Sequence, residues 1–140
     1  MTAHVLVGVD GSEGSRHALA WALGEAQARH WQVEAVMVWQ LPYNFGEGYY
    51  PVDEQRLAAD AAERLATALA EVAGNNPPVE INPVVLEGDP AETLCERSRD
   101  AELLVLGSRG LGRFSALLLG SVSGKCAHHS NCPVVIVPTP

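Results

Sequence analysis

Short apolar segments alternate with helical patterns along the whole of this 140-residue chain. Five apolar runs are expected as buried strands, at residues 4–9, 32–39, 79–86, 103–106 and 133–137. Apolar residues at helical spacing predict helices at about 15–29 and 52–73, and two shorter helices begin near Asp89 and Ser121, each residue acting as a cap. Strands joined by short crossovers of this kind run parallel. We therefore predict an α/β fold, a doubly wound five-stranded parallel sheet in the order 3-2-1-4-5 with helices on both faces.

Length and composition fit one globular domain over residues 1–140. Apolar residues make up 47% of the chain and charged residues 19%, which argues against disorder. No apolar run approaches the ~20 residues that cross a bilayer, and no signal-peptide pattern opens the chain, so we expect no membrane association. Three cysteines at irregular spacing do not form a disulfide framework, and we expect a cytoplasmic protein.

The charges are unevenly distributed. The net charge is −8, which argues against a nucleic-acid partner, because binding one requires Lys and Arg to neutralise phosphates. Residues 103–140 nevertheless contain Arg109, Arg113 and Lys125 and no acidic residue. Either this segment keeps a place for an anion, or a buried strand and a short helix simply leave little room for charge.

Two turns meet at one point of the predicted sheet. In the order 3-2-1-4-5 the first and fourth strands are neighbours, so Asp10 and Gly107 lie at adjacent carboxyl ends. Doubly wound sheets bind ligands at this switch in strand order. The residues alone therefore predict a binding crevice between these two turns.

The turn after the fourth strand contains a spaced glycine pattern. Its form is Gly107-x2-Gly110-x9-Gly120-Ser121. Glycines allow a backbone to approach a ligand closely, and the start of a helix presents free amides with partial positive charge. The pattern predicts a cradle for phosphates, although the glycines could equally serve the turns alone.

This pattern and its surroundings resemble the nucleotide-binding branch of the universal stress protein family. The resemblance extends over the whole chain, through VGVDGS at the first strand, Gly88-Asp89-Pro90, LLVLGSRG, LGSVS and the closing CPVVIVP. It implies a homodimer that binds ATP together with a divalent cation such as Mg²⁺. It also implies a stress-response regulator or sensor.

The resemblance assigns ten contact residues. Beside the adenine and ribose it places Val9, Asp10, Val38 and Leu106. Beneath the ribose and phosphates it places Gly107, Gly110, Gly120, Ser121, Val122 and Ser123. Asp10 would also lie near a metal-bound phosphate, as an indirect partner of Mg²⁺. No residue is assigned a catalytic role.

Four other known motifs are matched only in part by this sequence. Residues 120–126 lack the spacing of a P-loop and have Cys126 after the lysine, and Ser115 replaces the third glycine of a dinucleotide fingerprint. A phosphoacceptor role for Asp10 would require a lysine at the end of the fifth strand, where Pro138 stands. A DxD phosphatase would require an acid in place of Ser12. A further alternative for Asp10 is that it only caps the first helix.

Four residues have the types of a zinc site, namely Cys126, His128, His129 and Cys132. Cys126 falls within a predicted helix and Cys132 enters a strand, so tetrahedral convergence is unfavourable. The histidines are better explained by the favourable charge at a helix C-terminus, and Cys95 by a place in the core.

Residues 40–51 form an aromatic loop with Tyr43, Phe45, Tyr49 and Tyr50. Such a loop could be a nucleotide lid, a partner surface or a flap packed on its own domain.

Residues 133–137 form an edge strand in the predicted order, and its VVIV sequence has no charge to prevent pairing with another chain. We predict a homodimer through this strand.

The leading hypothesis is a homodimeric ATP-binding regulator with at most slow turnover, because no arginine finger and no base other than Asp10 is evident. A slow ATPase or other nucleotide hydrolase using the same pocket is an alternative. So is an interaction module that binds no nucleotide. Whether the nucleotide is ATP, ADP, AMP or cyclic AMP is left open.

Overall fold

The computed structural model describes residues 2–41, 52–110 and 119–140. The elements follow one another as β1 (His4–Gly8), α1 (Glu13–Arg29), β2 (Gln32–Trp39), α2 (Glu54–Ala73), β3 (Ile81–Glu87), α3 (Pro90–Arg97), the 3₁₀ turn η1 (Ser98–Asp100), β4 (Leu103–Gly107), α4 (Ser121–His129) and β5 (Val134–Val137). Their alternation is the one predicted.

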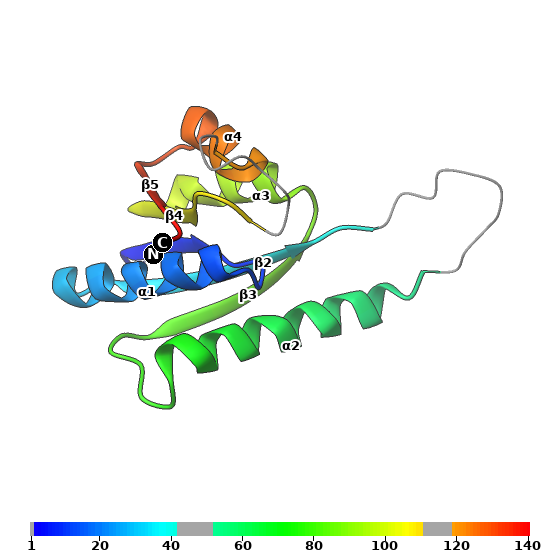
Figure 1. Ribbon diagram of the computed structural model, residues 1–140, viewed down its shortest axis with the longest axis horizontal. Coiled ribbons are helices and arrows are strands. Elements are labelled where there is room, and N and C mark those ends of the chain that lie inside the picture. The colour runs from blue at the N-terminus through cyan, green and yellow to red at the C-terminus, as the bar shows by residue number, and fades with distance from the viewer. Residues whose placement is uncertain (1, 42–51, 111–118) are drawn as a thin grey trace.

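The five strands form a single parallel sheet in the order β3-β2-β1-β4-β5, which confirms the predicted topology (Figure 1). Figure 1 shows α1 and α2 on one side of the sheet and α3 and α4 on the other. Because both faces are covered, the central strands are apolar at successive positions rather than at alternate ones.

Strand β1 shows how the two faces are filled. Val5 and Val7 pack in the core beneath α1 and α2, whereas Leu6 packs in the core beneath α3 and α4. All three side chains are fully buried. This alternation follows from the two-residue period of a strand, and it fixes β1 at the centre of the molecule.

The two sheet edges differ in sequence. At the two ends of β3, the backbones of Glu80 and Gly88 form hydrogen bonds to β2. The odd-numbered residues between them therefore direct their backbone N–H and C=O groups away from β2, toward the open edge of the sheet. Pro83 is one of these outward positions, where its missing N–H costs no ladder bond. At β5, the carbonyls of Pro133 and Val137 accept hydrogen bonds from the β4 side. The backbone N–H and C=O groups of Val134 and Ile136 therefore point away from β4, toward the open edge of the sheet.

The predicted starts of α1, α2 and β3 were each wrong by two residues, and the predicted cap of α4 was wrong as well. Helix α1 begins at Glu13, before the predicted residue 15, because the Ser12 side chain accepts a hydrogen bond from the Ser15 N–H at 3.2 Å. Ser121 does not cap α4. It is the first helical residue, and Gly120 takes the cap position, where its N–H donates to the Ser108 carbonyl at 2.7 Å.

Among the described residues, no helix is long and apolar enough to cross a membrane.

Candidate functional site

A cavity of about 180 Å³ opens at the carboxyl ends of β1 and β4. Its walls come from the ends of these two strands, from β2, and from the first turns of α1, α3 and α4. All ten contact residues named from the sequence line this cavity: Val9, Asp10, Val38, Leu106, Gly107, Gly110, Gly120, Ser121, Val122 and Ser123. The structure thus brings together residues from four separate segments, 9–10, 38, 106–110 and 120–123, at the predicted switch in strand order.

One part of the cavity wall is apolar. Val9 and Leu106 lie at the ends of β1 and β4 and are only 3% and 4% exposed. Leu94 of α3 closes this wall, and it packs so tightly that a Cβ on Gly8 would lie 2.9 Å from its Cδ1 atom. Such a wall suits a flat apolar group such as a purine ring.

Asp10 is held firmly beside this wall. One carboxylate oxygen, Oδ1, accepts hydrogen bonds from the N–H and the hydroxyl of Ser12, at 2.9 and 2.5 Å. The Asp10 carbonyl accepts a hydrogen bond from Arg64 at 3.0 Å. Ser12, not Asp10, caps α1, so the capping alternative for Asp10 was wrong. Asp10 instead orients the capping residue.

The second carboxylate oxygen of Asp10 faces the opposite turn. A Cβ added to Gly110 would lie 2.5 Å from Oδ2, closer than any real Cβ contact. The absence of a side chain at residue 110 is therefore what leaves room for the carboxylate. Among the described lining residues, Asp10 carries the one negative charge and Arg109 the one positive charge.

Helix α4 begins at the cavity without a side-chain cap. Helices α1, α2 and α3 are capped by the side chains of Ser12, Asp53 and Asp89, whereas Gly120 has no side chain to cap α4. The first amides of α4 are therefore left for a ligand, at the positive end of the helix dipole.

Ser123 lines the cavity, but its hydroxyl is already paired within the protein. The Oγ atom is buried and donates to the carbonyls of Ser108 and Gly120, at 3.1 and 3.2 Å. These bonds hold the glycine turn against the start of α4. Ser121, by contrast, is exposed at the cavity.

Two glycines bring the walls together. A Cβ on Gly107 would lie 2.8 Å from the backbone of Gly14, and a Cβ on Gly14 would lie 2.5 Å from the carbonyl oxygen of Arg109. The first turn of α1 therefore lies directly on the backbone at the end of β4. Only residues without a side chain permit this approach.

Sequence reasoning missed part of the wall. The unpredicted lining residues are Gly8, Ser12, Ser15, Val36, Pro90 and Leu94. The turn chemistry of Asp10-Gly-Ser-Glu-Gly-Ser pointed toward the two serines. Pro90 belonged to the Gly88-Asp89-Pro90 motif but was not assigned to the site, and Leu94 carried no local signal, because only the packing of α3 against the sheet places it here.

The remaining sequence predictions concern a metal site, the aromatic loop and Arg113. Among residues 2–41, 52–110 and 119–140, no three His, Cys, Asp or Glu side chains gather where they could share a metal ion. The predicted roles of the aromatic loop residues and of Arg113 lie outside the described residues.

Comparison with known proteins identifies the family. The sequence model of the universal stress protein family matches residues 1–138, and the chain belongs to this family. Universal stress protein Rv2623 of Mycobacterium tuberculosis is 37% identical over 135 residues, which cover 96% of this chain and 44% of that protein. The chain spans about half the length of the curated relatives it matches, at 44–47%.

Solved structures share the fold. The universal stress protein UspA from Lactobacillus plantarum superposes with a TM-score of 0.76 at 21% identity, covering 97% of both chains. A universal stress protein solved in complex with cAMP has a TM-score of 0.63 at 27% identity, covering 99% of this chain and 98% of that one.

Proposed function

We propose that this chain is a cytoplasmic stress-response regulator or sensor that binds ATP with Mg²⁺ in the cavity between β1 and β4. The observation that carries the proposal is that the uncapped start of α4 opens onto the same cavity as the apolar wall and Asp10. A ligand that joins a flat ring to an anion satisfies both ends of such a site. In this proposal residues 1–140 form one nucleotide-binding domain.

The choice of an adenine nucleotide draws support from the relatives. One of the similar solved structures is described as a complex with cAMP. The ring would contact Val9, Val38 and Leu106, and the phosphates would lie near the start of α4. The enclosed volume is below the ~300 Å³ of a typical ligand pocket, so the described walls would surround only part of the nucleotide.

Asp10 fits a role beside Mg²⁺. Its Oδ1 atom is committed to Ser12, while Oδ2 points across the cavity toward Gly110. An oxygen donor of this kind is what Mg²⁺ takes from a protein when phosphates and water supply the other ligands. The cation would offset the repulsion between this carboxylate and the phosphates.

Replacing Asp10 with Asn tests this role while preserving the shape of the side chain. The amide oxygen can accept both bonds from Ser12, so only the charge is lost. We expect Mg²⁺ to strengthen ATP binding clearly in the wild type and at least fivefold less in the variant, about 1 kcal/mol. Calorimetry with Mg²⁺ and with EDTA measures the difference. Asp53→Asn, at the exposed cap of α2, should behave as the wild type, and an equal Mg²⁺ effect in both variants would contradict the role.

Turnover should be slow in this proposal. Rapid phosphoryl transfer relies on several positioned charges, and the described cavity wall offers only Asp10 and Arg109. Incubation with ATP and Mg²⁺ followed by chromatography separates the possibilities. Intact ATP after hours supports a sensor. Rapid release of phosphate that Asp10→Ala abolishes would establish a hydrolase instead.

The direct test of the function is mass spectrometry of small molecules released from freshly purified protein. We expect an adenine nucleotide, and the spectrum distinguishes ATP, ADP, AMP and cyclic AMP. If none is released and calorimetry with ATP–Mg²⁺ gives no heat, the proposal fails and an interaction module without nucleotide takes its place.

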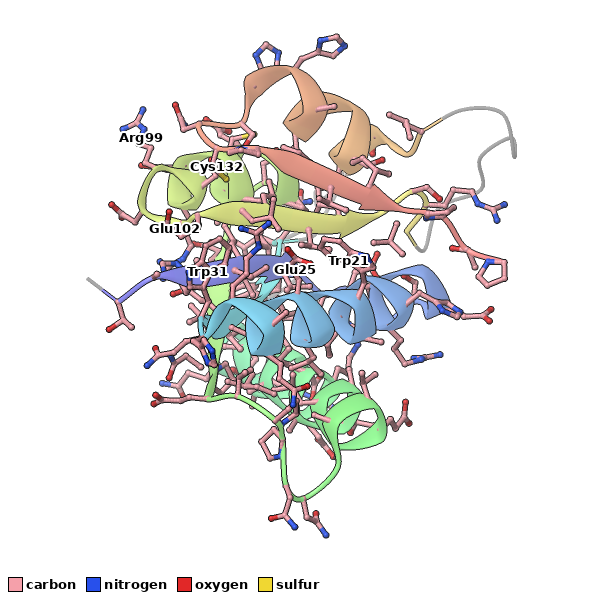
Figure 2. The ribbon with its side chains drawn as sticks, turned by 90° about the vertical axis from the view of Figure 1, so that its left-hand side faces the viewer. Trp21, Glu25, Trp31, Arg99, Glu102 and Cys132 are labelled. Atoms are coloured by element: carbon pink, nitrogen blue, oxygen red, sulfur yellow. The ribbon has the colours of Figure 1, made fainter. Side chains whose placement is uncertain are left out.

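We further propose a homodimer in which β5 pairs antiparallel with β5 of a second copy. Val134 and Ile136 present their backbone groups outward on this uncharged edge. In Figure 2, the labelled Trp21 and Trp31 lie below β5, and Cys132 lies near the start of this strand. Trp21 is 39% exposed, which leaves apolar surface on α1, a helix that contacts β5.

Replacing Ile136 with Pro should yield a monomer, because proline removes an outward N–H that the second copy needs. Ile136→Ala loses the same side chain but keeps the N–H, so it should remain a dimer. Sedimentation at matched concentrations compares the two. A proline variant that stays dimeric would place the interface elsewhere.

A further inference from the structure

Two cysteines face each other on the side of the sheet covered by α3 and α4. The Sγ atoms of Cys95 in α3 and Cys126 in α4 are 3.6 Å apart. Cys126 is fully buried, and Cys95 is half-buried. The third cysteine, Cys132, lies near Ser130 and Pro133 and takes no part in this contact. All three thiols are free.

Cys95 is accessible from a groove between the two helices. This groove of about 610 Å³ is lined by Cys95 together with the acidic residues Asp89, Glu92 and Glu96 and the basic residues Arg99 and Lys125. Cys126 does not line it. Burial raises the pKa of the Cys126 thiol to about 12, so this sulfur stays protonated. A small oxidant entering the groove therefore meets Cys95 first.

We propose that Cys95 and Cys126 are a peroxide-responsive pair whose disulfide joins α3 to α4. The Cys95 thiolate attacks one oxygen of hydrogen peroxide, the O–O bond breaks, and hydroxide leaves to become water. The Cys126 sulfur then attacks the sulfenic sulfur of Cys95, the S–O bond breaks, and the proton of Cys126 leaves with the oxygen as a second water. Two thiols lose two electrons, and one peroxide becomes two waters.

The disulfide would act on the cavity through both helices. A bonded pair of sulfurs is ~2.05 Å apart, so closure requires them to approach by about 1.5 Å. Leu94, directly before Cys95, lines the cavity, and Cys126 lies one turn after the buried Ser123. Drawing α3 toward α4 shifts both walls from the spacing that fits the ligand. We expect nucleotide affinity to fall at least threefold, an effect that rests on the proposed function.

In the first test, the purified chain is treated with hydrogen peroxide, and the disulfide is detected by mass spectrometry without added nucleotide. We expect a mass loss of about 2 Da, a Cys95–Cys126 link in the peptide map, and reversal by dithiothreitol. Cys132→Ala should give the same link. Cys126→Ala leaves Cys95 without a partner, so this protein should gain the mass of oxygen at Cys95. Cys95→Ala should neither form the disulfide nor gain oxygen. Formation of any other link, or oxidation confined to Cys132, would overturn the pair.

Calorimetry with ATP–Mg²⁺ on the reduced and oxidised Cys132→Ala protein tests the effect on the cavity. An affinity reduced at least threefold on oxidation, and restored by dithiothreitol, supports the coupling. Equal affinity in the two forms would overturn the coupling. If neither form binds nucleotide, the proposed function fails. The mass measurement still shows whether the Cys95–Cys126 disulfide forms.

Discussion

Replacing Gly110 with Trp should reduce ATP affinity by about 100-fold, or about 2.7 kcal/mol. The reason is steric, because even a Cβ at this position would lie 2.5 Å from Oδ2 of Asp10. A large ring would displace the carboxylate and fill the space in front of the α4 amides. Isothermal titration with ATP–Mg²⁺ measures the loss.

Gly124→Trp is the matched control for this substitution. Gly124 lies in α4, only four residues after the helix cap, yet a Cβ at this position would have open space around it. The same ring placed there should leave ATP affinity within about twofold of the wild type. Equal affinity in the Gly110 and Gly124 variants would show that the phosphates do not lie at the glycine turn.

Two glycine-to-alanine substitutions should change stability in opposite directions. Gly107→Ala forces a methyl group to within 2.8 Å of the Gly14 backbone, so the start of α1 must move away from β4. Overpacking of this kind costs about 1–3 kcal/mol. Gly24→Ala has open space around it within α1, and the better helix propensity of alanine should stabilise the protein by about 0.5–1 kcal/mol.

Urea unfolding of the two variants and the wild type compares their free energies of unfolding. The opposite signs are the diagnostic result, since the chemical change is identical. If Gly107→Ala were neutral, the close approach of α1 to β4 would not constrain the cavity. Its effect on nucleotide binding should follow its effect on stability, because the same contact shapes the wall.

The sheet order could be predicted because each strand carries its own signal. Strand β1 is apolar on both of its faces, and short links admit few topologies. The positions of Asp10, Gly107 and Gly110 followed from that order. The glycine spacing predicted a phosphate cradle at this point, whereas the adenine, the Mg²⁺ and the individual contacts came from the family resemblance.

Other features depend on contacts that no local pattern records. Ser12 rather than Asp10 caps α1, a choice between two good capping residues that only the geometry of the turn decides. Leu94 reaches the cavity because α3 crosses the sheet. Cys95 and Cys126 are 31 residues apart, and nothing in either helix alone indicates that their sulfurs meet.

The contrast between the sheet edges bears on how far assembly can proceed. Pro83 removes a donor from the outward row of β3, whereas the outward row of β5 keeps its donors. A two-fold pair through β5 uses the β5 edges of both copies, so a further copy would have to add at β3, where one donor is missing. Association through β5 would thus stop at two copies. Pro83, which disfavours the addition of a third, lies at the opposite edge of the sheet from the proposed interface.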